Sequence, residues 1–187
     1  MQNPGPAASG SQFVVHTDRP AIQRRHGGIL VLHGAITVAI VLLMVWVSGL
    51  GLGLAPALPF LLLLVLEIFQ LSYHAYVYGT RVAISEPLTL THHGFTLNTA
   101  AGRMEVPWEA VATVRVRRRF RSNLLVIGLH PAVVPSSPGV QTDIDPSYWS
   151  RMMKIGGPML GEKGIRESFD QIKQAVTHFS QGRVPIG

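Results

Sequence analysis

Two long apolar runs, separated by a short turn, constrain this chain more than any other feature of its sequence. They cover residues 29–50 and 57–78, and Glu67 is the only formal charge in either of them. At about 1.5 Å per helical residue, each run is long enough to cross a hydrocarbon layer of about 30 Å. The sequence therefore predicts a transmembrane helical hairpin over residues 29–80. It argues against an ordinary soluble enzyme.

The basic residues around these runs predict the orientation of the hairpin. Arg19, Arg24 and Arg25 precede the first run, Arg81 follows the second, and the turn contains no Lys or Arg. Because positively charged flanks stay in the cytoplasm, we expect a multi-pass protein with both termini cytoplasmic. A cleaved signal peptide ending near residues 55–57 is the alternative, but the first run is long for one and a second span follows at once.

The residues outside the hairpin divide into a tail and a domain. Residues 1–28 are predicted to be a disordered N-terminal tail and basic linker, because the first twelve are rich in Pro, Gly and Ser and poor in apolar side chains. Residues 81–187 are numerous enough for one small domain. Cysteine is absent, which excludes disulfides, cysteine zinc sites and thiol nucleophiles.

Alternation of apolar and polar residues predicts an antiparallel β meander in the first part of this domain. The predicted strands cover residues 88–91, 95–98, 103–106, 114–117 and 124–129. The Pro-rich segment 131–158 is predicted to be mostly loop, with a short helical turn near residues 146–153. Apolar residues spaced three and four apart then predict an amphipathic helix over residues 164–180.

These residues resemble the bacterial membrane-anchored pleckstrin-homology (PH)-like domains. The resemblance rests on Gly94-Phe95, Gly102 and the run Val106-Pro107-Trp108-Glu109, with two spans placed before the domain. It implies a two-helix transmembrane hairpin plus an α+β PH-like domain, an antiparallel β meander or barrel capped by a C-terminal α-helix, in a bacterial inner membrane. It also implies binding of lipids, peptides or proteins rather than catalysis. The Pro-rich segment 131–158 departs from the family pattern, which has strands there.

A basic run in the domain is the first candidate site. Five arginines lie within seven residues: Arg115, Arg117, Arg118, Arg119 and Arg121. Near a cytoplasmic leaflet, each can contribute about 1 kcal/mol of attraction to anionic lipid. The alternatives are a solvated strand edge whose charges prevent aggregation, or contact with an acidic protein partner. No aromatic stacking pattern accompanies the arginines, so nucleic acid is not an expected partner.

Polar residues within the apolar runs are the second candidate site. Glu67, Gln70 and His74 are spaced i, i+3 and i+7 and are predicted to share one helix face. If the hairpin turns near Gly53, His33 lies level with His74. Ionisable groups are costly at this depth, so this intramembrane polar stripe is predicted to hold helices or subunits together, with a proton or ion path as the alternative.

These features predict a membrane-anchored PH-like binding or scaffold module at the cytoplasmic face, and not an enzyme. Its expected partners are anionic lipid headgroups and a protein partner or a second copy of the chain. The alternative is an accessory subunit of a larger integral membrane complex, held by the polar stripe, followed by a small intramembrane enzyme or transporter that uses Glu67 and His74. No motif predicts a cofactor or a metal, because the adjacent His92 and His93 point to opposite faces of a strand.

Overall fold

The computed structural model describes residues 10–50, 57–119 and 122–187. The chain divides into two compact units. One is a helical hairpin, Arg19–Ala83, and the other is a sheet-rich unit built from the residues up to Asp18 and from Ile84 onward. The predictions for Arg121 and for most of the turn between the two spans lie outside the described residues.

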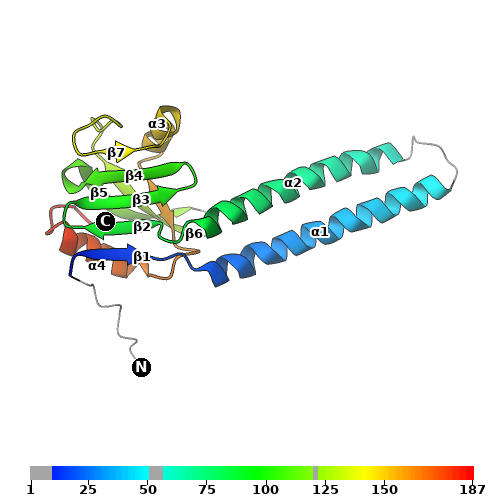
Figure 1. The fold of residues 1–187 in the computed structure, drawn as a ribbon, viewed down its shortest axis with the longest axis horizontal. Coiled ribbons are helices and arrows are strands. Elements are labelled where there is room, and N and C mark those ends of the chain that lie inside the picture. The colour runs from blue at the N-terminus through cyan, green and yellow to red at the C-terminus, as the bar shows by residue number, and fades with distance from the viewer. Residues whose placement is uncertain (1–9, 51–56, 120–121) are drawn as a thin grey trace, which may run out of the picture. The chain divides into compact units, whose positions relative to one another are not determined.

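The hairpin consists of α1 (Arg19–Gly49) and α2 (Leu58–Ala83), drawn in blue to green in Figure 1. Both helices are long and apolar enough to cross a membrane, as predicted. Both are also longer than predicted. The basic linker prediction is wrong for residues 19–28, because Ile22 and His26 are buried there and continue the helical spacing of the apolar run.

A seam of inward-facing side chains joins the two helices. Buried or half-buried residues recur along α1 at 26, 30, 33, 37, 40, 44 and 47, and along α2 at 60, 64, 67, 71, 74 and 78. Alternating spacings of three and four residues are the pattern of paired helices that pack side chains between one another. The other faces leave large apolar side chains such as Val31 and Phe69 exposed, which suits a surface covered by lipid.

The sheet-rich unit contains two antiparallel sheets. The larger has the strand order β1-β2-β3-β4-β7, formed by β1 (Gln12–Val15), β2 (Leu88–Thr91), β3 (Gly94–Thr99), β4 (Gly102–Pro107) and β7 (Gln141–Thr142). The smaller has the order β5-β6-β8, formed by β5 (Val111–Arg119), β6 (Ser122–Leu129) and β8 (Met159–Gly161). A short 3-10 helix, η2 (Trp108–Ala110), connects the two sheets, and its buried Trp108 donates a hydrogen bond from Nε1 to the carbonyl of Thr91 at 2.8 Å.

Two helices complete this unit: α3 (Pro146–Lys154) and α4 (Phe169–Phe179). Side chains from both sheets and from α4 form one hydrophobic core, in which Leu88, Val114 and Ile172 are fully buried. The predicted helix over 164–180 is therefore present but begins later. It begins after Ser168 because the Oγ of this residue accepts a hydrogen bond from the Gln171 N–H at 3.2 Å, forming a capping box.

The five predicted strands are confirmed, and three further strands were not predicted. β1 lies in the predicted linker and pairs with β2, from Gln12 opposite Thr91 to Val15 opposite Leu88. The linker prediction is therefore also wrong for these residues. β7 lies in the segment predicted to be mostly loop, and α3 confirms the short helical turn predicted there near residues 146–153. All three extra strands are short and lie at the edge of a sheet. Each forms because it pairs with the neighbouring strand, and its own sequence shows no alternation of apolar and polar residues long enough to predict it.

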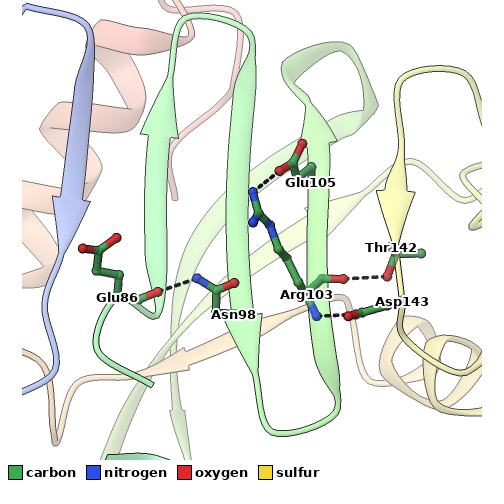
Figure 2. A network of polar contacts seen from close by, with 6 residues as sticks. All are labelled: Glu86, Asn98, Arg103, Glu105, Thr142 and Asp143. Atoms are coloured by element: carbon green, nitrogen blue, oxygen red, sulfur yellow. Dashed lines mark hydrogen bonds and ion pairs between the residues drawn. The ribbon is translucent and has the colours of Figure 1, made fainter. Parts of the chain in front are cut away.

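Polar contacts hold β7 against β4 (Figure 2). Thr142 Oγ1 donates to the Arg103 carbonyl at 3.0 Å, and Asp143 Oδ1 accepts from the Arg103 backbone N–H at 2.5 Å. The Arg103 guanidinium pairs with Glu105 on the same strand. The charge of Arg103 is thus balanced by a neighbouring acid within the sheet.

Candidate functional site

Strand β5 presents its arginines on the side opposite the core. Val114 on this strand is fully buried and Val116 is half-buried, whereas Arg115, Arg117 and Arg119 are exposed. Side chains alternate between the two faces of a strand, so these three arginines share the outer face, as predicted from the sequence. Arg118 lies on the other face and is exposed too, because it follows the last core position of the strand.

Two arginines elsewhere in the unit are paired with an acid: Arg103 with Glu105, and Arg183, which donates from Nη1 to Glu109 Oε1 at 2.6 Å. Within the described ranges of the chain, Arg115, Arg117 and Arg118 make no hydrogen bond or ion pair through their side chains. Their positive charges are therefore available to an anionic surface or partner.

The basic strand lies beside the end of helix α3. A Cβ atom added to Gly156 would lie 3.4 Å from Nη2 of Arg115, so the guanidinium reaches the loop that follows α3. The last turn of α3 carries two further basic residues, Arg151 and Lys154, and both are exposed. Positive charge thus extends from β5 towards a second element.

The hairpin brings three of the four predicted polar residues together. His33 Nδ1 lies 2.5 Å from Glu67 Oε1, and both side chains are mostly buried, with 17% and 12% of their surfaces exposed. The rings of His33 and His74 stack, with their centroids 5.2 Å apart. Thr37 Oγ1 donates to the carbonyl of His33 at 2.9 Å. His33 and Glu67 therefore satisfy one another inside a single chain.

Gln70 does not join this cluster. It is exposed, whereas Glu67 and His74 lie in the seam. A residue three positions after Glu67 is rotated about 60° from it around a helix with 3.6 residues per turn, which moves Gln70 out of the seam. Of the three residues of the predicted stripe on α2, Glu67 and His74 therefore lie in the seam, whereas the amide of Gln70 lies outside it.

His26 is a polar residue of the seam that the sequence analysis did not single out. Its side chain is buried, and neither ring nitrogen has a hydrogen-bond partner within the part of the chain that the structure describes. Its nearest ring is that of Tyr78, with a centroid separation of 6.4 Å. His26 lies seven residues, or about two helical turns, before His33. This spacing places both on one helix face and could have identified His26 as a residue of the seam.

The remaining histidines do not form a metal centre. Among the described residues, no three His, Asp or Glu side chains lie close enough together to hold a metal ion. His92 packs its ring against Phe179, with centroids 5.0 Å apart, and the adjacent His93 is exposed.

Comparisons with protein-family models, with curated proteins and with solved structures find no match to this chain. The chemistry of the basic strand and of the polar seam therefore has to carry the functional assignment by itself.

Proposed function

We propose that this chain is a non-enzymatic, membrane-anchored binding module whose sheet-rich unit contacts anionic lipid headgroups through Arg115, Arg117 and Arg118. The resemblance to bacterial membrane-anchored PH-like domains supports the proposal at the level of fold. The sheet-rich unit has two antiparallel sheets and ends with helix α4, which resembles the outline of that family, although β1 precedes the hairpin and α3 lies between β7 and β8. Nothing in the proposal requires a cofactor.

One observation carries the proposal: three exposed arginines without a counter-ion, in a unit tethered directly to a membrane-spanning helix. Ile84, the first residue of this unit after the hairpin, follows Ala83, the last residue of α2. A short tether keeps the local concentration of lipid headgroups high. Each arginine near an anionic leaflet contributes about 1 kcal/mol, and the attraction falls off within a Debye length.

The pairing of β1 with β2 supports the proposed topology. β1 precedes the hairpin and β2 follows it, yet their residues pair directly, with Phe13 opposite Leu90. This pairing favours a hairpin whose two flanks lie on the same side of the membrane. Arg24, Arg25 and Arg81 at the ends of the spans favour the cytoplasmic side of a bacterial inner membrane.

The full chain in lipid nanodiscs tests the headgroup contact. Because the chain has no cysteine, Ser122→Cys gives one attachment point for a fluorophore at the start of β6, opposite Arg119. We expect lipids with a nitroxide on the headgroup to quench this fluorophore more strongly in discs containing phosphatidylglycerol than in phosphatidylcholine discs. High salt should remove the difference, because it screens exposed charges.

Two double variants that each remove two positive charges distinguish the effect of the basic strand from the effect of the net charge of the chain. Arg115→Gln with Arg117→Gln should abolish the lipid-dependent quenching. Arg166→Gln with Lys173→Gln removes the same charge from other elements and should leave the quenching unchanged. Equal quenching in neutral and anionic discs, or equal loss in both double variants, would contradict the proposal and favour a solvated strand or an acidic protein partner.

A second candidate function, an accessory subunit of a membrane complex, is favoured by Gln70. The His33–Glu67 contact is made within one chain, so these residues are occupied. Gln70 instead exposes an amide on the outer face of α2, where polar side chains hydrogen-bond to neighbouring helices. We propose that any subunit contact inside the membrane uses Gln70 rather than the inward pair.

Crosslinking in native membranes tests this second function. Gln70→Leu should reduce the yield of crosslinked assemblies, because it removes the amide that a neighbouring helix would bind. Ser72→Leu changes another exposed polar residue of α2 and serves as the control. If both variants assemble like the unmodified chain, the accessory-subunit hypothesis is rejected.

A further inference from the structure

A cavity of about 280 Å³ opens in the sheet-rich unit, where helix α3 and the loop after it pass strands β3 and β8. Its walls include Leu97, Met152, Ile155, Pro158 and Met159, and Arg151 stands among them. The lining is mostly apolar, which is the usual character of a site for a small organic ligand. This cavity is separate from the arginines of β5 and was not predicted from the sequence.

The apolar wall of the cavity runs from the core to the surface. Leu97 and Met152 belong to the hydrophobic core, with 2% and 7% of their surfaces exposed. Ile155 and Tyr148 lie at the outer end and are 52% and 41% exposed. A chain of methylene groups placed along this wall would cover side chains that water now contacts, which is favourable.

Among the described residues that line the cavity, Arg151 is the only charged one. Its guanidinium lies over the ring of Tyr148, 5.8 Å from the centroid, and its Nε donates to the Ser147 carbonyl at 3.4 Å. No acidic side chain pairs with it within the described residues. The Asp145 carboxylate at the start of the same helix is close enough for the charge of Arg151 to act on it. The outer end of the cavity therefore offers one positive charge beside an apolar wall.

The backbone of Gly157 forms part of the cavity lining. This residue has a φ of +113°, and a Cβ atom on it would lie 2.2 Å from the carbonyl oxygen of Ile127. The loop after α3 can approach β6 this closely only because position 157 has no side chain. This part of the lining is therefore set by the backbone conformation, whereas the remaining walls are side chains.

We propose that this cavity binds the aliphatic chain of an anionic amphiphile, with Arg151 holding its carboxylate or phosphate head. A cavity of about 280 Å³ has room for several methylene groups, as in a medium-chain fatty acid or the end of a longer acyl chain. The proposal does not depend on headgroup contact by β5.

Methionine methyl groups provide the readout. Met152 and Met159 line the cavity, whereas Met44 lies in α1 of the hairpin and reports amphiphile that has merely dissolved in the bilayer. The full chain, with ¹³C-labelled methionine methyls, is placed in phosphatidylcholine nanodiscs and titrated with octanoate. We expect saturable shifts of the Met152 and Met159 signals that Met44 does not share. Absence of a saturable shift at both cavity methyls overturns the proposal.

Three variants test which residues bind the anionic head of the amphiphile and which contact its aliphatic chain. Arg151→Gln should weaken octanoate binding about tenfold, the effect of losing a charge-assisted hydrogen bond, and leave octanol binding unchanged. Lys154→Gln removes a charge from the same helix turn outside the lining and should change neither. Ile155→Ser, at an exposed position, should weaken both ligands. If Arg151→Gln and Lys154→Gln bind octanoate equally, the assignment of the anionic head to Arg151 is overturned.

Two further samples identify the source of the amphiphile. In phosphatidylglycerol nanodiscs without octanoate, a shift of the same two methyl signals supports the proposal with a membrane lipid as the occupant. A shift that requires octanoate in both kinds of disc supports it with a free fatty acid as the occupant.

Discussion

At the scale of single residues, the contact between His33 and Glu67 is the feature with the clearest energetic consequence. Both side chains lie in the seam between α1 and α2 and are mostly buried. Inside a bilayer no water replaces a lost partner, so each group depends on the other. The contact should therefore contribute to the pairing of the two helices more than an exposed polar contact would.

A double-mutant cycle measures this contribution. His33→Leu and Glu67→Leu, alone and together, should give a coupling of about 0.6 to 1.7 kcal/mol, the range found for hydrogen bonds between membrane helices. The quantity to measure is the free energy of separating α1 from α2 in bicelles. Gln70→Leu, at an exposed position, should show no coupling with His33→Leu. A coupling near zero for the His33–Glu67 cycle contradicts the role given to the contact.

The sequence predicts this cluster only in part, and the reason is rotational. Spacing identifies Glu67 and His74 as neighbours on one face, and equal depth in a hairpin places His33 beside them. Spacing alone does not say which edge of a polar stripe faces the partner helix. Gln70 lies on the edge away from the partner helix and is exposed. His26 belongs to the seam but lies in a segment that its arginines led us to interpret as a linker.

At the scale of elements, helix α3 depends on the residue that caps its N-terminus. Asp145 caps the helix, and its Oδ1 accepts from the backbone N–H of Ser147 at 2.8 Å and of Tyr148 at 3.3 Å. Hydrogen bonds from Ser147, first from its side chain and then from its backbone, lower the pKa of Asp145 below its ordinary value. Since the carboxylate accepts these bonds more strongly than the protonated acid does, the cap is strongest when Asp145 is ionised.

The sign of the pH dependence follows from this lowered pKa. The carboxyl of Asp145 has its ordinary pKa in the unfolded chain and a lower one in the folded chain, so its contribution is complete above the unfolded value. It is lost as the pH falls through the folded value. Hydrogen-exchange protection of the Trp149 amide, which donates to the Asp145 carbonyl at 2.9 Å, should therefore decrease in acid relative to that of Ile172 in α4.

Asp145→Asn provides the control, because asparagine caps a helix without titrating over this range. Protection of Trp149 in this variant should be independent of pH in the acidic range, after correction for the intrinsic exchange rate. The same acid-induced loss in the variant and in the unmodified chain would show that another group is responsible.

The strands show what periodicity can and cannot predict. β2 through β6 each place apolar side chains at alternate or consecutive positions, as in Leu88 and Leu90 of β2, both fully buried. β7 has two residues and β8 has three, which is too short for any period to appear. β1 has four, but it is separated from its partner β2 by the whole hairpin, so no local signal in the sequence connects them.

At the scale of the whole molecule, the proposed topology makes a direct prediction about accessibility. Ser48 lies near the end of α1 and Ser122 at the start of β6. In intact cells, a membrane-impermeant thiol reagent should label Ser48→Cys, because the end of the hairpin faces outward. It should label Ser122→Cys only after lysis. Labelling of Ser122→Cys in intact cells would reverse the orientation and remove the cytoplasmic leaflet as the surface that the arginines contact.

The division of the sheet-rich unit around the hairpin also has a consequence for biosynthesis. β1 leaves the ribosome before either span, whereas its neighbour β2 follows both. In the proposed topology, the edge of the larger sheet therefore stays incomplete until the entire hairpin has been inserted into the membrane. A chain that inserts only one span would leave β1 and β2 on opposite sides of the membrane, unable to pair. Such a chain displays Val15 and Leu88, which are fully buried in the completed fold, to the proteases of quality control.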